Sequence, residues 1–314
     1  MRAIPFVVLT IIILGASCGT DQPQATDEGE RANQGESVVI SLLGDTLDLP
    51  LFDADTAARL ERDALEAAAT LEQDPSAENF VWLGRRLAYL WRYERAIAVF
   101  TNGIRAYPDD PALYRHRGHR LITLRHFQPA IADLRQGTAL VEGQPDQVEL
   151  DGAPNAANIP RTTLHYNLWY HLGLAYYLSA DFDRAADAFR RALDVSRNDD
   201  ATVAAADWLY MSLRRGGHET EAAEVLVPIR QEMDILENSS YHRRLLMYKG
   251  LLPPDSLLGA DDDLDLATQG YGVANWYLYN GDSATAETLL RRVVDGDYWP
   301  AFGYIAAEAE LSRR

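Results

Sequence analysis

Two stretches of this 314-residue chain can be laid over each other with an offset of 34 residues. Gly84 and Gly118 are related by this offset (118 − 84 = 34), and so are Ala96 and Ala130 (130 − 96 = 34). The apolar positions of each stretch recur at the spacing of one helix face, which predicts two helices per unit. Small residues let the two helices approach, and large residues fill the gap to the next unit. The first stretch carries Phe80, Leu83, Gly84, Leu87, Ala96, Phe100, Gly103 and Pro108, and the second carries Tyr114, Gly118, Leu121, Ala130, Leu134 and Gly137.

Further copies follow at less regular spacing. Gly173 lies 55 residues after Gly118 (173 − 118 = 55), so about 21 residues are inserted between the second and third units. They fall in a stretch rich in Gly, Pro, Asn and Asp, which predicts an exposed loop. A second insertion carries Pro253-Pro254 and an acidic run. We expect repeats near 77–110, 111–140, 166–199, 203–232 and 267–298, with insertions near 141–160 and 233–265.

This pattern resembles the tetratricopeptide repeat, in which a bulky aromatic, a Leu-Gly pair, a small Ala and a closing Pro recur every 34 residues. The resemblance implies an all-α fold, a right-handed superhelical solenoid of antiparallel helix pairs that occupies residues 56–314. It also implies a binding scaffold, because stacked repeats offer a long concave surface. Helical stretches at 56–71 and 300–311 are expected at the two ends.

The first residues look like an export signal. Arg2 precedes the apolar run 4–14, which is too short to span a bilayer comfortably, and small residues lead into Cys18, the one cysteine of the chain. This resembles a bacterial lipoprotein signal at 1–17, with lipid attached to Cys18, although Leu14 stands four residues before the cysteine where the family prefers three. An ordinary secretory signal or an uncleaved anchor are the alternatives.

Residues 18–55 are expected to be a lipidated N-terminus followed by an acidic, flexible tether, because 19–37 contain almost no bulky apolar residues. Residues 37–51 become apolar again, and they fit either a short hairpin or an extended segment. Gly19 follows the cysteine where an Asp would favour the inner membrane. The resemblance therefore implies a cell-envelope protein, at the outer membrane if the organism has one.

Charge limits the range of partners. The formal net charge is −18, which argues against nucleic acid, since phosphate binding needs an excess of Lys and Arg. One segment departs from this sign: residues 113–126 (LYRHRGHRLITLRH) hold four arginines, three of the seven histidines and no acid. A cationic patch within an acidic protein favours an anionic ligand.

The family resemblance gives this patch a place. In a tetratricopeptide unit the first helix lines the groove, through positions 2, 5, 6, 9 and 12 or 13 of the repeat. Counted in this way, the groove and partner-binding residues are Arg85, Tyr89, Arg115, His116, His119, Asn167, Tyr170, His171, Trp208 and Arg214.

Arginine pairs two-pronged with carboxylates, and tyrosine and tryptophan supply large contact areas. The set is similar to the carboxylate clamp of peptide-binding tetratricopeptide domains, so the expected ligand is an acidic segment or a C-terminal carboxylate of a protein partner. In the alternative, these side chains are structural: their stems cover apolar surface, or they pair with acids of the next repeat.

Catalytic motifs are missing from the sequence. There is no Gly-rich phosphate loop, no nucleophile elbow and no His-Glu-x-x-His, and the pair His116 and His119 lacks further ligands for a metal. We therefore expect a non-catalytic scaffold without metal or cofactor. A second hypothesis is a binding protein or enzyme accessory subunit whose groove takes a small anionic ligand such as a glycan fragment.

Overall fold

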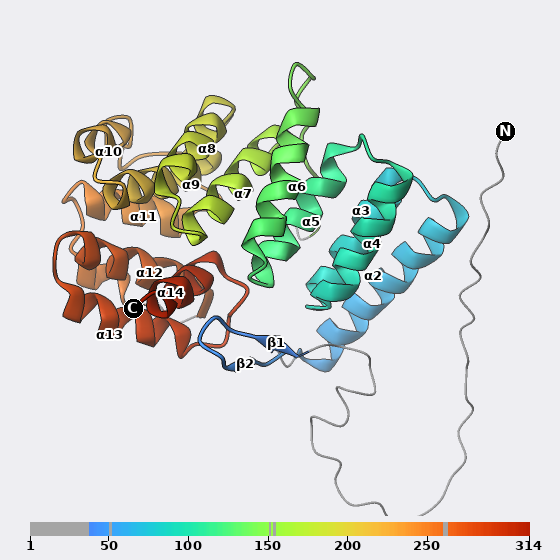
Figure 1. Cartoon of the computed structure of the whole chain (residues 1–314), viewed down its shortest axis with the longest axis horizontal. Coiled ribbons are helices and arrows are strands. Elements are labelled where there is room, and N and C mark those ends of the chain that lie inside the picture. The colour runs from blue at the N-terminus through green and yellow to red at the C-terminus, as the bar shows by residue number, and fades with distance from the viewer. Residues whose placement is uncertain (1–37, 50–51, 151, 153–154, 260–262) are drawn as a thin grey trace, which may run out of the picture. The chain divides into compact units, whose positions relative to one another are not determined.

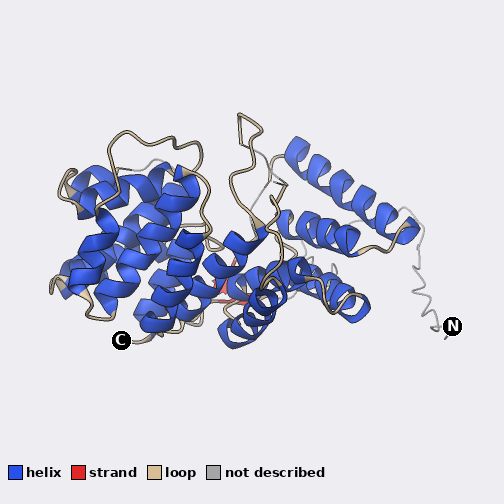
Figure 2. Ribbon diagram, turned by 90° about the horizontal axis from the view of Figure 1, so that it is seen from above, coloured by secondary structure: helices blue, strands red, loops and turns tan. Residues whose placement is uncertain are grey.

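Helices form nearly all the regular structure of the residues that the computed structural model describes, namely 38–49, 52–150, 152, 155–259 and 263–314, all within the unit Val38–Arg314. The predicted signal sequence, Cys18 and residues 18–37 of the predicted tether lie outside them. Figure 2 shows strands only in one short hairpin. In the described part of the chain, no helix is both long and apolar enough to cross a membrane.

The elements follow one another as helix pairs (Figure 1). A two-stranded hairpin comes first, and the helices stack from α2 to α10 before α11–α14 return beneath α7–α9, as the contacts α9–α12 and α7–α14 also indicate. The bounds are β1 Val39–Ile40, β2 Thr46–Leu47, α2 Ala54–Gln73, α3 Ala77–Tyr89, α4 Tyr93–Ala106, α5 Pro111–Thr123, α6 Phe127–Leu140, α7 Leu164–Leu178, α8 Phe182–Asp194, α9 Asp199–Arg215, α10 Glu219–Leu226, α11 Ser239–Tyr248, the 3-10 turn η1 Pro254–Leu257, α12 Asp263–Tyr279, α13 Ser283–Val294 and α14 Phe302–Ser312.

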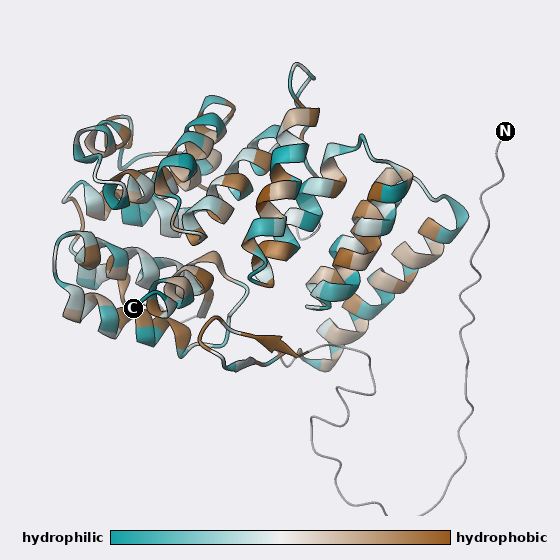
Figure 3. Cartoon of the chain, in the orientation of Figure 1, coloured by the Kyte–Doolittle hydropathy of each residue, from teal (hydrophilic) through white to brown (hydrophobic). Residues whose placement is uncertain are grey.

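Five hairpins, α3/α4, α5/α6, α7/α8, α9/α10 and α12/α13, confirm the predicted all-α solenoid of antiparallel helix pairs. Helices such as α3, α4 and α8 are amphipathic, whereas α7, α9 and α14 are buried on nearly all sides, and Figure 3 shows apolar and polar bands along the helices. The small residue near the start of each second helix is fully buried in every hairpin. These residues are Ala96, Ala130, Ala185, Ala222 and Ala286.

In three hairpins a glycine of the first helix faces a large side chain 16 residues later. A Cβ atom on Gly84 would stand 2.2 Å from the ring of Phe100, which no real contact allows. This close approach explains the repeated glycine that the sequence shows. The other two pairs are Gly118 with Leu134 and Gly173 with Phe189.

The same turn joins the two helices of all five hairpins. The second residue after the first helix is left-handed in each, with φ between 58° and 92°. The next amide donates to a carbonyl five residues back, as Arg92 does to Leu87 at 3.0 Å and Asp282 does to Tyr277 at 2.9 Å. This is the Schellman arrangement that ends many helices. The left-handed residues are Trp91, Arg125, Ala180, Gly217 and Gly281.

Two of these turns hold the C-terminal segment. Trp91 packs edge-on against Trp299, with ring centroids 5.2 Å apart. Arg125 donates from Nε and Nη2 to the carboxylate of Glu308, at 2.8 and 2.7 Å, and both side chains are buried. A left-handed conformation costs a non-glycine residue about 1–2 kcal/mol. We infer that these side-chain contacts offset that cost.

The two insertions and the N-terminal segment differ in what they form. Residues 233–265 are not a simple break in the period, because α11 packs against both α9 and α12 and places Arg244, fully buried, against Asp207.

Residues 39–47 form the hairpin β1–β2, with Val39 opposite Leu47, which decides between the two alternatives for this segment. Trp299 Nε1 donates to the carbonyl of Asp48 at 2.7 Å. Most described residues of the loop 141–160 are exposed, as predicted, but the Glu149 side chain is mostly buried against α5 and α7.

Replacing Arg125 with glycine tests the role of the turn. Arg125→Gly relieves the left-handed strain but leaves the buried carboxylate of Glu308 without its partner, and breaking such a pair costs about 3–5 kcal/mol. We expect a net loss of about 2–4 kcal/mol in the free energy of unfolding, measured by urea denaturation. Ala180→Gly, at the same turn position, is the control and should leave stability unchanged or raise it by up to about 1 kcal/mol. Equal effects of the two variants would contradict this account.

Candidate functional site

The first helices α3, α5 and α7 lie side by side, since α5 contacts both of the others. We call the surface that they share the groove face. A segment of the 141–163 connection, Gln147–Leu150, lies against it, and we call this the groove segment. Eight of the ten predicted groove residues come from these three helices: Arg85 and Tyr89 from α3, Arg115, His116 and His119 from α5, and Asn167, Tyr170 and His171 from α7.

Three of these residues surround the carboxylate of Glu149. His116 Nε2 lies 2.9 Å from Oε1, Asn167 Nδ2 donates to Oε2 at 2.6 Å, and Arg115 Nε lies 3.3 Å from Oε2. The Glu149 side chain is only 13% exposed. Burial alone would raise the pKa of Glu149, but Arg115, His116 and Asn167 more than offset it and hold that pKa well below the ordinary value.

The hydrogen bonds of His116 fix its protonation state. Arg115 Nη1 lies 2.8 Å from Nδ1, and an arginine can only donate, so Nδ1 accepts and the proton of the neutral ring is on Nε2, which lies 2.9 Å from Glu149 Oε1. This assigns the neutral Nε2–H tautomer. Burial first, and then the neighbouring Arg115, lowers the pKa of His116 to about 3. Arg115, His116 and Glu149 therefore lie in a row in which Arg115 is positively charged, His116 is neutral and Glu149 is negatively charged.

Two arginines of α3 bind the backbone that follows Glu149. Arg85 Nη1 donates to the carbonyl of Leu150 at 2.7 Å, and Arg86 Nη1 donates to the carbonyl of Gly152 at 3.1 Å. Tyr89 lies against Gly152 so closely that a Cβ atom there would meet its hydroxyl at 2.1 Å. The groove face thus recognises both a carboxylate and main-chain carbonyls.

The groove segment is extended. Val148 forms an antiparallel bridge with Thr163, the amide of Glu149 donates to the carbonyl of Thr162 at 3.0 Å, and the amide of Leu164 donates to the carbonyl of Gln147 at 2.9 Å. Side chains alternate along it as in a strand: Val148 and Leu150 are 57% and 59% exposed, whereas Glu149 between them is held by the helices.

The remaining histidines and Tyr170 pack rather than bind. The rings of His119 and His171 are 4.4 Å apart, and both contact Phe302 of α14. Burial holds the pKa of each well below its usual range. Tyr170 is buried and donates to the hydroxyl of Tyr241 at 3.3 Å. These contacts join α5 and α7 of the groove face to α14 and α11.

The last two predicted residues lie elsewhere. Trp208 is fully buried between Phe189 and Tyr271, so the prediction that it lines a groove is wrong and the residue belongs to the core. Its hairpin departs from the pattern used to count positions, because residue 210, twelve before the buried Ala222, is a tyrosine rather than a glycine. Arg214 packs on Tyr279 beside a separate cavity of about 600 Å³, lined by Ala180, Arg214, Arg215, Leu278, Tyr279, Glu310, Arg313 and Arg314.

Sequence reasoning missed Glu149 and Arg86. Glu149 lies in the stretch predicted to be an exposed loop, and its role is visible only once the loop folds back on α5. Arg86 does not fall on a counted groove position. The sequence signal that pointed towards Glu149 was the cationic stretch 113–126, because in a chain of net charge −18 such a stretch is expected to pair with an acidic residue.

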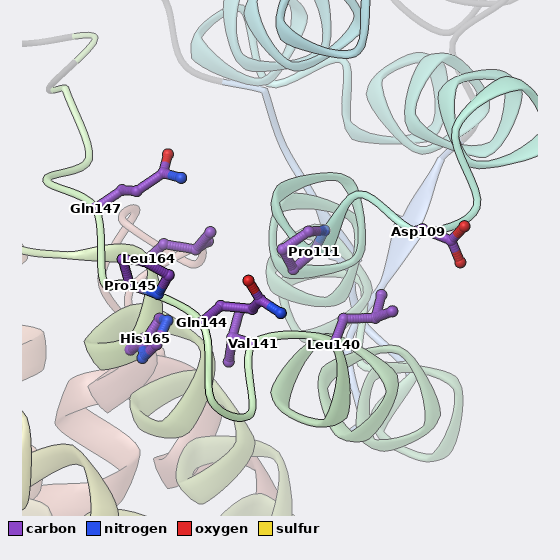
Figure 4. Close-up of a pocket in the computed structure, with 9 residues that line it drawn as sticks. All are labelled: Asp109, Pro111, Leu140, Val141, Gln144, Pro145, Gln147, Leu164 and His165. Carbon is purple, nitrogen blue, oxygen red and sulfur yellow. The ribbon is translucent and has the colours of Figure 1, made fainter.

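Two cavities flank the connection that carries the groove segment. One, of about 430 Å³, lies between the ends of α5, α6 and α7 and the loop (Figure 4). Figure 4 shows Asp109 and Pro111 on one side and Pro145, Leu164 and His165 on the other. A second, of about 520 Å³, lies beside Glu142, Gly143 and Gln144. Among the residues that the structure describes, no group of three or more His, Cys, Asp or Glu could hold a metal ion.

Comparison with known proteins adds one family match and several structures of similar fold. Residues 166–199, which span most of α7 and all of α8, match the family model described as tetratricopeptide repeat. No curated protein matches the chain. A tetratricopeptide repeat protein from Parabacteroides merdae is 14% identical with a TM-score of 0.48, over 82% of this chain and 94% of that one.

YrrB, described as a tetratricopeptide repeat protein with an unusual peptide-binding site, is 15% identical with a TM-score of 0.43, over 74% of this chain and 92% of that one. PilF of Pseudomonas aeruginosa is 14% identical with a TM-score of 0.44, over 78% and 89%. At these identities and TM-scores, the likeness carries no argument about the ligand or partner of this chain.

The buried neutral His116 predicts a pH dependence of stability. Its folded pKa of about 3 lies below the value near 6.5 expected in the unfolded chain, so only the unfolded state gains a proton here as the pH falls from 7 to 5. The contribution to stability is therefore present above pH 6.5 and lost on acidification, by about 2 kcal/mol at pH 5. Urea unfolding at pH 7 and pH 5 measures it.

The variant His116→Gln should lose that part of the pH dependence, because an amide can accept from Arg115 and donate to Glu149 without titrating. The exposed His126 provides the matched control, His126→Gln. If His116→Gln and the wild-type protein lost equal stability between the two pH values, His116 would not be held neutral in the fold.

Proposed function

Because the protein carries a tetratricopeptide repeat and folds as stacked helical hairpins, we propose that it is a non-catalytic scaffold that binds an extended peptide segment of a partner protein on the groove face. Helical repeat arrays present extended surfaces of this kind. No described residue group suggests a reaction, since the buried histidines and tyrosines of the face pack against one another or hold the chain's own loop.

One observation supports the groove face in particular: it already binds an extended, acidic piece of polypeptide. The contacts from Arg85 and Arg86 go to main-chain carbonyls, which every peptide has, and those from Arg115, His116 and Asn167 go to one carboxylate. This division between backbone positioning and a single specific anchor is how extended peptides are recognised. A partner segment with a glutamate or aspartate side chain, or a free C-terminal carboxylate, fits the same contacts.

A photocrosslinking amino acid at position 150 tests the proposal. Leu150 is exposed on the groove segment, so a probe there reaches any peptide bound to the face. We expect a covalent adduct in native membranes whose crosslinked peptide, sequenced by mass spectrometry, contains an acidic residue. The adduct should fall at least tenfold in an Arg85→Ala/Arg115→Ala background, because each charged hydrogen bond contributes about 1.5–3 kcal/mol.

The matched control places the same probe at Val227, which is 76% exposed at the end of α10 and away from α3, α5 and α7. An adduct that forms equally from position 227, or that survives the double substitution in folded protein, would contradict a partner site on the groove face. The synthetic form of the identified segment should bind the purified protein.

We also propose that lipid on Cys18 anchors the protein in a bacterial cell envelope and that residues 18–37 give the repeats reach from the membrane. The support is the apolar run 4–14 followed by small residues and the one cysteine of the chain. Two or more acyl chains hold a protein stably at a membrane, whereas one does not. Gly19 after the cysteine favours the outer membrane where one exists.

Cys18→Ser should release the protein from the membrane fraction and remove the acyl mass from its N-terminal peptide, as read by fractionation and mass spectrometry. Ser17→Ala, which keeps a small residue beside the cysteine, is the control and should leave both readouts unchanged. Membrane association that survives Cys18→Ser would favour the uncleaved anchor instead.

A further inference from the structure

The carboxylate bound on the groove face belongs to the chain itself. We propose that Glu149 is an internal ligand: it occupies a carboxylate site made by Arg115, His116 and Asn167, and a partner peptide binds by displacing it. The inference rests on the proposed function and adds the chemistry of the partner to it. The ligand class is an extended peptide that carries one carboxylate between aliphatic residues, as the groove segment does.

The site made by Arg115, His116 and Asn167 is selective for a carboxylate. Both oxygens of Glu149 lie close to nitrogens of the site, Oε1 at 2.9 Å from His116 and Oε2 at 2.6 and 3.3 Å from Asn167 and Arg115. The other charged or titratable groups described near this site on α3, α5 and α7 are Arg85, Arg86, Arg120, His119, His171, Tyr89 and Tyr170, and none is a carboxylate. The site is thus cationic within a chain of net charge −18, and a neutral side chain in place of Glu149 would lose the charge attraction to Arg115.

Apart from the Glu149 carboxylate, the groove face contacts mainly the backbone of the segment. Arg85 and Arg86 bind main-chain carbonyls, and the side chains of Val148 and Leu150 point away with more than half of their surface exposed. A peptide from another protein could make every one of these contacts. Nothing about them requires that the segment be covalently part of this chain.

Apart from the contacts of the Glu149 carboxylate and the Leu150 carbonyl, which a displacing peptide replaces with its own, little holds the groove segment in place. Two main-chain hydrogen bonds join it to residues 162–164, and cavities of about 430 and 520 Å³ flank the loop that carries it. It buries no large apolar side chain, so its departure exposes little apolar surface. Asp146, just before it, stays fixed by Arg197 at 3.1 Å and by the amide of His165 at 3.1 Å. That anchor keeps the displaced segment near the site, where it competes at high effective concentration.

A binding experiment with the full chain tests the inference. The probe is a fluorescein-labelled synthetic peptide with the sequence of residues 145–152, PDQVELDG, and the comparison peptide has glutamine in place of its glutamate. Fluorescence anisotropy gives the dissociation constants for the wild-type protein, for Glu149→Gln and for Glu142→Gln. Glu142 is an exposed glutamate of the same loop and serves as the matched control.

We expect Glu149→Gln to bind the acidic peptide at least tenfold more tightly than the wild-type protein and than Glu142→Gln, because the internal competitor is weakened. It should also prefer the acidic peptide over the glutamine peptide at least tenfold, and adding Arg115→Gln should abolish that preference. A folded Glu149→Gln protein that gains no affinity, or that binds both peptides equally, would overturn the inference.

Hydrogen exchange on the wild-type protein decides the matter if Glu149→Gln does not fold. Excess acidic peptide should speed exchange at the amide of Glu149, which donates to Thr162 in the closed state. Unchanged exchange at saturating peptide would show that the segment is permanent structure. That result would leave the scaffold proposal standing if the crosslinking at position 150 succeeded, so the two failures can be told apart.

Discussion

The left-handed turn at the top of each hairpin is the constraint on which the rest of the structure depends. It reverses the chain within three residues and so brings the second helix of each pair against the first, in three hairpins at a glycine of the first helix. At Trp91 and Arg125 the turn residue also carries a large side chain, and those two side chains hold the C-terminal segment through Trp299 and Glu308. The same two residues therefore adopt the strained left-handed conformation and hold the C-terminal segment against the first two hairpins.

The packing of the C-terminal helix α14 also shapes the groove face. With α14 in place, Phe302 packs on His119 and His171, so the rings of these two predicted ligand-binding residues contact the C-terminal helix, and His171 is buried. The open part of the face is then limited to α3, α5 and the start of α7, where Glu149 lies. Positive charge is thus concentrated on one surface of an acidic protein, and a carboxylate from the chain's own loop is bound there.

Period and composition predicted the helix pairs well, because small residues at fixed spacing are required wherever two helices touch. The family resemblance, which implies that repeat positions 2, 5 and 6 face the groove, placed Arg115, His116 and Asn167 on one face. None of these signals could predict Glu149, whose position depends on how a loop without periodicity folds back. Nor could they predict the burial of Trp208, because α11 covers its hairpin, and α11 lies in a stretch that breaks the repeat.

The central claim is that the groove face holds the ionised carboxylate of Glu149, and its titration tests this most directly. Carbon-13 NMR of side-chain-labelled glutamate, with the Glu149→Gln spectrum to assign the signal, gives the pKa of this one group. The account predicts a pKa well below the ordinary glutamate value of 4.5, because Arg115, His116 and Asn167 stabilise the charged form. A pKa at or above 4.5 in the folded protein would show that the carboxylate is not bound and would contradict the account.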